Sequence, residues 1–383
     1  MSSLYRLLRR TFSTATSAAI ADNSNSKAKS LSREIYSERN FEQLVEKFKN
    51  ASVDERFRKK HAVYKETIRR LAAARKLHYV EEILEDQKKY KDISKEGFNA
   101  RLITLYGSVR MFDNARKVFE EMLERKCDVT VLSFNALLGA CVNSKKFDEA
   151  EGLFKGFSKD LEIEPDLISY NTILKAYCEM GSLDSAVLLL DEMEKKGLEP
   201  DLITFNTLLF GFYVKGRFVD GENIWKQMKE KNVKPDRYSY NAKLLGLTLD
   251  KRMEDAVKVV EEMKSEGIEL NTVSYNALIR GFVNEEDLEE AKHWYGETVR
   301  SGFKRDRLTF ERLIPFALQK GDFIFAYDVC KDVLSSKLHF QEALMQPVVD
   351  ALAKESKIKE AKELVHLGNA HRDCSYKLKL PSI

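Results

Sequence analysis

The stretch SYNTILKAYCEMGSLDSA (residues 169–186) returns along the chain with small changes. Similar stretches begin at Ser133, Thr204, Ser239 and Ser274. The small residue that ends each stretch recurs every 35 residues, with one interval of 36, at Ala115, Ala150, Ala186, Gly221, Ala256, Ala291, Ala326 and Ala361. A fixed period of this length is typical of repeat architectures, in which each unit packs on its neighbours.

Each unit has the pattern of two short helices joined by a tight turn. In residues 167–201, we expect Ser169 to be the N-cap of the first helix, because its hydroxyl can accept a hydrogen bond from a free amide. Gly181 permits the turn, and Gly197 has the place of a C′ residue after the second helix. Helices this short are marginal alone in water, so stacking must bury their apolar stripes. The predicted fold class is therefore all-α, a solenoid of helix-turn-helix repeats of about 35 residues.

The same register divides the whole chain into segments. Residues 1–30 form a separate leader, residues 31–60 degenerate capping helices, and residues 377–383 a short basic tail. Between them we expect nine repeats over residues 61–376, at 61–95, 96–130, 131–166, 167–201, 202–236, 237–271, 272–306, 307–341 and 342–376.

The leader has the composition of a mitochondrial presequence. It holds five basic residues and one acid, Asp22, and is rich in Ser, Thr and Ala. Its leucines would form one face of an amphipathic helix, and it lacks the continuous apolar core of a secretory signal. Residues 10–13 resemble a plant mitochondrial cleavage site, so we expect cleavage near Phe12 or soon after. The expected location is the mitochondrial matrix, with the chloroplast as the alternative.

The rest of the chain is close to electrical neutrality. Without the leader, it holds 59 basic and 60 acidic residues. A protein that grips nucleic acid through phosphates alone is usually strongly basic, so an RNA-binding chain of this composition must gather basic residues on one face. No apolar run approaches the ~18 residues that a membrane span needs, and we expect no such span.

Motifs of catalysis or metal binding are not found in the sequence. The five cysteines are widely spaced without a Cys-x-x-Cys pair, and the six histidines have no ligand spacing. No Walker lysine loop, Gly-x-Ser-x-Gly or His-Glu-x-x-His sequence occurs. We therefore expect a protein without enzymatic activity, cofactor or bound metal, whose cysteines are buried as small apolar residues.

The 35-residue period, a Tyr/Phe-Asn pair near the start of a unit and Pro-Asp at its end resemble the pentatricopeptide repeat (PPR) family. The nearest rival, the tetratricopeptide repeat, has a 34-residue period and a Trp in its first helix, whereas Trp225 and Trp294 fall in second helices. The resemblance implies a right-handed superhelix whose first helices line a concave surface. It also implies that single-stranded RNA lies there, at about one base per repeat.

The resemblance further implies which residues contact the bases. In this family the fifth and the last residues of a unit read the base edge, and the apolar second residue wedges between bases. The base-reading pairs here would be Asn135 with Asp166, Asn171 with Asp201, Asn206 with Asp236, Asn241 with Asn271, and Asn276 with Asp306. The wedges would be Leu132, Ile168, Ile203, Tyr238 and Val273. The family rule then gives a pyrimidine run, approximately U-U-U-C-U. The competing interpretation is that these Asn and Asp residues are ordinary capping and turn residues.

Other units depart from this pattern and cannot be decoded. The unit at 96–130 offers Ala100 and Thr130, and the unit at 307–341 offers Glu311 and Gln341. The last unit has Gln346 and no clear partner. Glu311 would repel a nearby phosphate.

The chain resembles the P subclass, because it holds no editing extension or zinc deaminase motif. FDNARKVFEEM (residues 112–122) followed by VLSFNALL (residues 131–138) resembles short PPR proteins that attach to the plant mitochondrial ribosome. The predicted function is non-catalytic binding of single-stranded RNA in organellar translation, as a ribosome component in contact with ribosomal RNA. The alternatives are a factor for the stability, processing or translation of one mRNA, and a protein scaffold. Expected partners are pyrimidine-rich or ribosomal RNA and the mitochondrial ribosome, and DNA is not expected.

Overall fold

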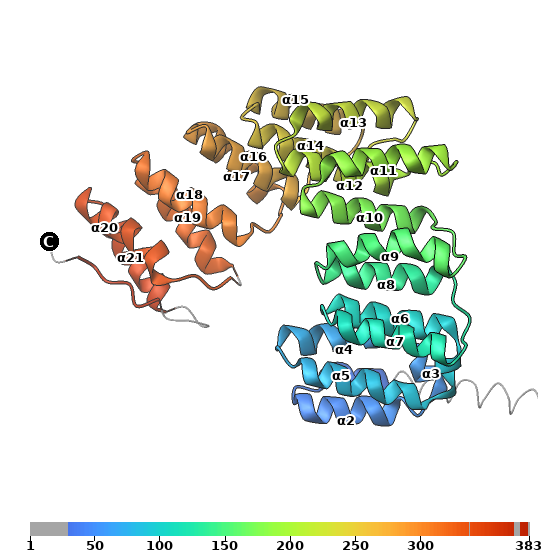
Figure 1. Cartoon of the computed structure of the whole chain (residues 1–383). Coiled ribbons are helices and arrows are strands. Elements are labelled where there is room, and N and C mark those ends of the chain that lie inside the picture. Colours follow the sequence, from blue (N-terminus) through green and yellow to red (C-terminus); the bar gives the residue numbers. More distant parts are fainter. Residues whose placement is uncertain (1–29, 337, 371–375, 382–383) are drawn as a thin grey trace, which may run out of the picture. The chain divides into compact units, whose positions relative to one another are not determined.

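The structure is a computed structural model that describes residues 30–336, 338–370 and 376–381 (Figure 1). The predicted presequence lies outside these residues, except for residue 30. All regular elements of the described ranges are helices, which confirms the all-α prediction. The chain divides into two compact units after Glu199.

The first unit is a stack of helical hairpins in which first helices pack on first helices. The helix α6 contacts α8, and α8 contacts α10, while each also packs on the second helix of its own hairpin. The elements of this unit are α2 (Phe41–Ala51), α3 (Glu55–Arg58), α4 (His61–Ala73), α5 (Leu77–Asp86), η1 (Gln87–Lys89), η2 (Lys91–Ser94), α6 (Glu96–Ser108), α7 (Phe112–Glu124), α8 (Val131–Asn143), α9 (Phe147–Asp160), α10 (Leu167–Met180) and α11 (Leu183–Lys195).

The second unit repeats this architecture. Its first helices also stack in order, α12 on α14, α14 on α16 and α16 on α18. Its elements are α12 (Leu202–Val214), α13 (Phe218–Glu230), α14 (Arg237–Leu249), α15 (Met253–Ser265), α16 (Thr272–Asn284), α17 (Leu288–Arg300), α18 (Arg307–Gln319), α19 (Phe323–Ser335), η3 (Glu342–Leu344), α20 (Gln346–Lys354) and α21 (Ile358–Asn369).

The turns use left-handed backbone, as the glycines predicted. Gly181 ends α10 with φ 87°, and Gly197 follows the C-cap of α11 with φ 77°. Arg110 and Lys145 occupy the turns of the two preceding hairpins with φ 62° and 60°. Arg110 and Lys145 thus adopt a left-handed conformation that favours glycine. The packing of the two helices on either side of each turn must therefore compensate for the backbone strain.

The aromatic residue of each Tyr/Phe-Asn pair belongs to the core. It is at least nine-tenths buried in five consecutive first helices, at Phe134, Tyr170, Phe205, Tyr240 and Tyr275, and Phe310, which Glu311 follows, is buried at the same place in α18. The small residue that defined the period is completely buried at Ala150, Ala186 and Ala256. The Asn that follows each aromatic residue is rotated by about 100° around the helix. It therefore leaves the core and lies on the surface that first helices share.

Gly221 replaces this alanine because the space is already filled by Tyr213. The Tyr213 ring is buried, and its hydroxyl donates to Glu222 at 2.7 Å. A Cβ added to Gly221 would lie 2.6 Å from Tyr213 Cε1, and one added to Gly246 would lie 2.3 Å from Tyr213 Cδ1. Two glycines thus make room for one large ring between neighbouring hairpins.

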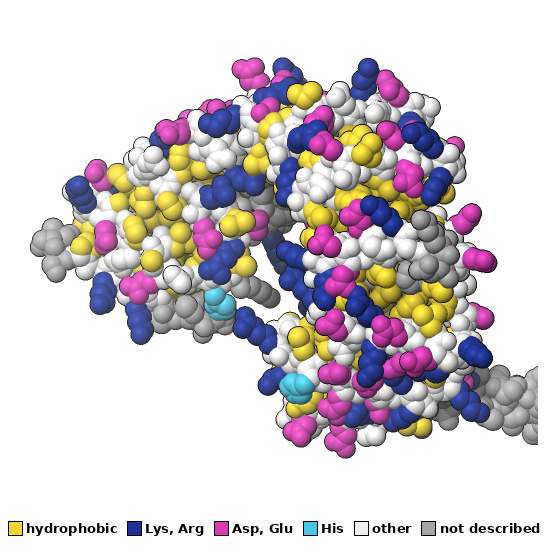
Figure 2. All heavy atoms as spheres, in the orientation of Figure 1, with side chains coloured by type: hydrophobic (Ala, Val, Ile, Leu, Met, Phe, Trp, Pro, Cys, Tyr) yellow, Lys and Arg dark blue, Asp and Glu magenta, His cyan; other side chains and the backbone are white. Residues whose placement is uncertain are grey.

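Charged residues of the second helices pair with each other across one repeat. These ion pairs include Lys49–Glu82, Arg116–Glu149, Lys229–Glu262 and Lys331–Glu363. Figure 2 shows acidic and basic side chains intermingled over the face drawn. Each exposed ion pair of this kind adds little stability, but together the pairs neutralise many charges of the second helices within the protein.

The segment predicted as a basic tail packs against the last hairpin. Leu378 is only 2% exposed, and a Cβ added to Gly368 would lie 2.6 Å from its Cδ1. Asn369 exchanges two hydrogen bonds with the backbone of Leu378, at 2.8 and 2.9 Å. The segment therefore covers part of the apolar surface of the α20–α21 hairpin.

We expect Gly221→Ala to lower the free energy of unfolding by about 1–2 kcal/mol, because overpacking against Tyr213 outweighs the gain in helix propensity. In a Tyr213→Val background, Gly221→Ala should be neutral or stabilising. The unit at 131–166 already has this combination, with Val142 at the position of Tyr213 and Ala150 at the position of Gly221. Urea unfolding of the two single variants and the double variant measures this coupling. Equal effects of Gly221→Ala in both backgrounds would contradict the packing argument.

Candidate nucleic-acid interface

Five consecutive first helices, α10, α12, α14, α16 and α18, begin at the Asp or Asn that ends the preceding unit. Asp166 is the N-cap of α10, with extended backbone, and its Oδ1 accepts from the backbone N–H of Ser169 at 3.0 Å. In return Ser169 Oγ accepts from the backbone N–H of Asp166 at 3.2 Å. The same capping box starts α12 at Asp201, α14 at Asp236 and α16 at Asn271.

The prediction that Ser169 is the N-cap was therefore wrong. Ser169 is the third residue of α10 and already lies within the helix, whereas an N-cap residue needs non-helical backbone. The carboxylate three residues earlier reaches the free amide instead. The sequence left two residues that could serve as the cap, and the competing interpretation of Asp166 as a capping residue agrees with the structure.

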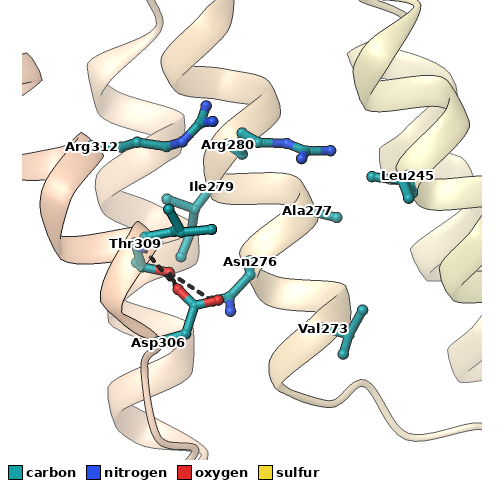
Figure 3. Close-up of a pocket in the computed structure, with 10 residues that line it drawn as sticks. Leu245, Val273, Asn276, Ala277, Ile279, Arg280, Asp306, Thr309 and Arg312 are labelled. Carbon is teal, nitrogen blue, oxygen red and sulfur yellow. Dashed lines mark hydrogen bonds between the residues drawn. The ribbon is translucent and has the colours of Figure 1, made fainter. Parts of the chain in front are cut away.

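The asparagines predicted to read bases join each cap to the preceding first helix. Asn135 Nδ2 donates to Asp166 Oδ1 at 2.9 Å, and Ser169 Oγ donates to Asn135 Oδ1 at 2.6 Å. Equivalent links join Asn206 to Asp236 at 3.1 Å and to Ser239 at 2.6 Å, and Asn241 to Asn271 at 3.3 Å and to Ser274 at 2.6 Å. Asn276 accepts from Thr309 Oγ1 at 2.9 Å (Figure 3). We call this arrangement of Asn, cap residue and Ser or Thr the cap link.

Asn171 lies in the first compact unit and Asp201 in the second. Asn171 is half-buried on α10. Asp201 is half-buried at the start of α12, where it accepts from the backbone N–H of Thr204 at 2.8 Å.

The cap link leaves part of each polar group for other partners. An Asn amide offers two N–H donors, and Asn135 uses one of them for Asp166. The hydrogen bonds to Asp166 described above fall on Oδ1, so its second oxygen, Oδ2, keeps the capacity to accept. Asn135 and Asp166 are half-buried, which leaves these remaining groups within reach of a ligand, whereas Asn241 is only 8% exposed.

Asn271 presents the opposite hydrogen-bonding character at its junction. Its Oδ1 accepts from the backbone N–H groups of Val273 and Ser274, at 3.0 and 3.1 Å. This fixes the orientation of the amide, because Nδ2 cannot accept a hydrogen bond. The group left over is therefore an N–H donor, where an Asp cap leaves an oxygen acceptor.

Asp166 is held as a carboxylate by its neighbours. Partial burial alone would raise its pKa, but hydrogen bonds from Asn135 and from the side chain and backbone of Ser169 lower the pKa below the ordinary value of an Asp. The link is thus charged at neutral pH.

Glu96 closes the junction that could not be decoded from Ala100 and Thr130. Its Oε1 accepts from the backbone N–H of Thr130 at 2.7 Å and from the Ser133 hydroxyl at 2.7 Å. Ala100 is buried and has no polar group to offer. Glu96 was not among the predicted site residues, although an acid at the first residue of a unit whose fifth residue is apolar is a usable signal.

Two more residues of the undecodable units have partners in the protein. Glu311, predicted to repel a phosphate, is paired with Arg307 at 2.6 Å, which offsets much of its charge. The Gln346 side chain donates to the backbone oxygen of Lys379 at 2.8 Å and accepts from its N–H at 3.0 Å. Gln346 therefore holds the C-terminal segment. Gln341 is exposed at the start of η3.

The predicted wedge residues form a row of exposed apolar side chains beside the cap links. Each is the second residue of a first helix, one turn before the Asn of the same helix, so the two side chains lie on one face. The exposed fractions are 51% for Leu132, 60% for Ile168, 62% for Ile203, 75% for Tyr238 and 56% for Val273. Leu308 has the same place in α18 and is 60% exposed. It was missed because the rest of its unit does not fit the family rule.

A cavity of about 200 Å³ lies between α16 and α18, where wedge and cap link meet (Figure 3). Val273 and Leu308 line it as successive wedges. Asn276, Asp306 and Thr309 supply its polar side. The geometry offers apolar surface for the faces of a flat group and hydrogen-bonding groups for its edge.

Within the described ranges, no group of three or more His, Cys, Asp and Glu side chains could hold a metal ion. No helix in the same ranges has the length and apolar character needed to cross a bilayer.

Comparisons with known proteins agree with the repeat architecture. A model of the PPR repeat family matches residues 165–214. A model of the pentatricopeptide repeat domain matches residues 97–144, 223–285 and 258–314. A model of the PPR repeat matches residues 132–159 and 203–233. Together they cover more than half of the chain. The crystal structure of the pentatricopeptide repeat protein PPR10 in complex with an 18-nt psaJ RNA element has a TM-score of 0.47 and 18% identity, covering 87% of this chain and 56% of that one.

Several similar proteins are from Arabidopsis thaliana. The chain is 54% identical over 215 residues to the small ribosomal subunit protein mS78 (rPPR3a), covering 52% of this chain and 53% of that protein. It is 57% identical over 189 residues to the small ribosomal subunit protein mS79 (rPPR3b), covering 49% and 48%. The small ribosomal subunit protein mL103 (rPPR7) is 38% identical over 133 residues, covering 34% and 32%. The chain spans about half the length of the first two relatives.

We expect Asp166→Ala to cost about 1 kcal/mol of stability at pH 7, because α10 loses its cap. The pKa of Asp166 is lower in the folded protein than in the unfolded chain, so its contribution is present above the ordinary Asp value and is lost as pH falls through the folded value. The difference between wild type and Asp166→Ala should therefore shrink below about pH 4.

Urea unfolding at pH 7 and pH 3 measures this difference. Asp166→Asn is the matched control, because Asn271 caps α16 without a charge. It should retain most of the stability at pH 7. A cost of Asp166→Ala that grows on acidification would contradict the linked, ionised cap.

Proposed function

This chain belongs to the pentatricopeptide repeat family, and we propose that it is a non-catalytic protein that binds single-stranded RNA as part of the mitochondrial ribosome. The observation that carries the proposal is the repeated pairing of an exposed apolar side chain with a cap link on first helices. Leu132 and Ile168 flank the Asn135 link in the first unit, and Tyr238 and Val273 flank the Asn241 link in the second. An unpaired base has the complementary chemistry, with two apolar faces and a polar edge.

Exposed apolar residues scattered over a protein surface need no explanation. These residues are different because they occur at the same place in consecutive repeats, next to polar groups that keep free capacity. Packing within the repeat does not require them, since they lie outside the core at more than half exposure. A ligand that repeats along its own length, as an extended RNA strand does, matches a row of identical sites.

The free groups of the cap links support selection of pyrimidines. The base edge of uracil carries an N–H at position 3, which the free oxygen of an Asp cap such as Asp166 or Asp236 can accept. Cytosine has an unprotonated nitrogen at the same position, which suits the N–H that Asn271 presents. The second N–H of Asn135 or of Asn206 can donate to a neighbouring carbonyl oxygen of either base. We therefore assign the pairs that begin with Asn135, Asn171, Asn206, Asn241 and Asn276 to a run of approximately U-U-U-C-U.

Membership of the ribosome is supported by the named relatives and by the charge of the chain. The names of mS78, mS79 and mL103 place those three proteins in a small ribosomal subunit. The body of this chain is nearly neutral, and many of its charges form ion pairs between repeats. Such a protein gains little affinity from phosphates in general, which suits a fixed partner in an assembly better than a search along many transcripts. The proposed location is the mitochondrial matrix.

We expect the double substitution Ile203→Ala and Tyr238→Ala to weaken binding of a U-U-U-C-U-containing RNA about tenfold, because base stacking on such side chains is worth ~1–3 kcal/mol per base for an aromatic platform. Fluorescence anisotropy with the full chain measures the Kd. The thermal midpoint should not change, since both side chains are exposed.

Val219→Ala is the matched control, because Val219 is 76% exposed on the second helix α13. It should leave the Kd unchanged. Wild-type affinity in the Ile203→Ala and Tyr238→Ala double variant would remove the wedge role from these residues.

We expect the mature protein to sediment with a ribosomal subunit in a sucrose gradient of mitochondrial extract. The association should resist high salt and mild RNase, as expected of a component buried in the particle. Crosslinking and sequencing of the attached RNA should give ribosomal RNA. Crosslinks confined to one mRNA would indicate a transcript-specific factor, and a peptide partner without RNA would indicate a scaffold.

A further inference from the structure

Arg280 on α16 has a side chain that the protein leaves without a counter-ion. Its Nε and Nη2 atoms are buried and have no hydrogen-bond partner. Within the part of the chain that the structure describes, neither Arg280 nor Arg312 on α18 forms an ion pair. Nearby arginines are different, since Arg300 pairs with Glu297 and Arg307 pairs with Glu311. Burying part of a cation without a partner is unfavourable, so Arg280 calls for an explanation beyond stability.

The two arginines line the same cavity as the wedges Val273 and Leu308. Figure 3 shows Arg312 extending from α18 toward α16, and Arg280 extending from α16 toward Leu245 of α14. Burial, and then the charge of Arg312, lower the pKa of Arg280 from its ordinary value, which places two like charges near each other. An arginine remains a cation at neutral pH even so.

The acid that lines this cavity is already engaged by the cap link. Asp306 Oδ1 accepts from the backbone N–H of Thr309 at 2.8 Å and lies 2.7 Å from its hydroxyl. In Figure 3 the Asp306 and Asn276 groups lie at one end of the cavity and the arginines at the other. A ligand that spans the cavity therefore meets hydrogen-bonding groups at one end and positive charge at the other.

We propose that Arg280 and Arg312 form an anion site that binds a phosphate of the RNA backbone, next to the base held between Val273 and Leu308. This inference rests on the proposed function and deepens it. A nucleotide has the matching layout, with a flat base and a phosphate at a fixed distance along its own backbone. Guanidinium groups suit phosphate because their N–H donors form a planar fork that matches its oxygens. In a chain whose body is nearly neutral, these two unpaired cations fix the path of the strand at this junction.

The test uses the full chain with both arginines replaced, Arg280→Gln and Arg312→Gln. The probes are an RNA with a U-U-U-C-U core and a set of the same RNAs in which each linkage in turn is an uncharged methylphosphonate. We expect the double variant to bind the unmodified RNA about tenfold more weakly, with a salt dependence reduced by about 0.7 in slope, the value for one phosphate on a single strand. One methylphosphonate should weaken binding by wild type and leave binding by the variant unchanged.

Arg300→Gln is the matched control, because it removes an arginine of a second helix that is paired with Glu297. It should keep the wild-type Kd and salt slope. Arg280→Met adds a readout that does not depend on RNA. It should raise the thermal midpoint by about 2 °C, since a partly buried charge without a partner is removed.

Wild-type affinity, salt slope and methylphosphonate sensitivity in the Arg280→Gln and Arg312→Gln double variant would overturn the phosphate site while leaving the proposed RNA binding intact. A fall in the thermal midpoint of Arg280→Met would also overturn it, because the arginine would then be structural. Failure of the wild-type chain to bind any of the RNAs would overturn the proposed function itself, and the phosphate site with it.

Discussion

The hydrogen bonds of the cap link are the interaction on which the rest of this structure depends. The first amides of a helix have no partner within the helix, and short helices are marginal alone. Asp166 satisfies such an amide in α10, and Asn135 of the preceding first helix holds Asp166 in place. One group of polar residues thus begins a helix and joins two repeats. Because the same link recurs in the second unit, it also sets the register of one first helix against the next.

This link unites two interpretations that the sequence set against each other. The Asp residues and Asn271 cap first helices, as the simpler interpretation held, and Asn135, Asn206 and Asn241 hold three of these caps in place. They are also oriented by that role, with one hydrogen-bonding group turned inward and another left over. A flexible side chain that read a base without such support would lose more entropy on binding. Capping and recognition are therefore compatible, and the capping role prepares the groups for a ligand.

The distribution of charge follows the division between first and second helices. Second helices carry most of the ion pairs between repeats, such as Lys229 with Glu262, and so present a mixed surface. First helices present apolar wedges and cap links, with few charges. Against this background Arg280 stands out on α16, because its buried Nε and Nη2 atoms have no partner and it lines one cavity with Arg312. A neutral body makes a small number of well-placed cations more selective than a broad basic surface, because affinity then depends on position and less on total charge.

The sequence by itself determined the all-α fold, the period, and the turns at Gly181 and Gly197. These follow from local patterns, since apolar spacing and turn residues report on a single helix or turn. Only the tertiary structure decided which residue caps which helix, because Asp166 and Ser169 are both suitable caps and backbone conformation separates them. It also decided that Glu96 closes one junction, that Tyr213 requires Gly221, and that Leu378 is buried. Each of these depends on contacts between residues of different helices or hairpins. The spacing of residues within one helix does not specify how much space a neighbouring helix leaves or which hydrogen-bond partners it offers.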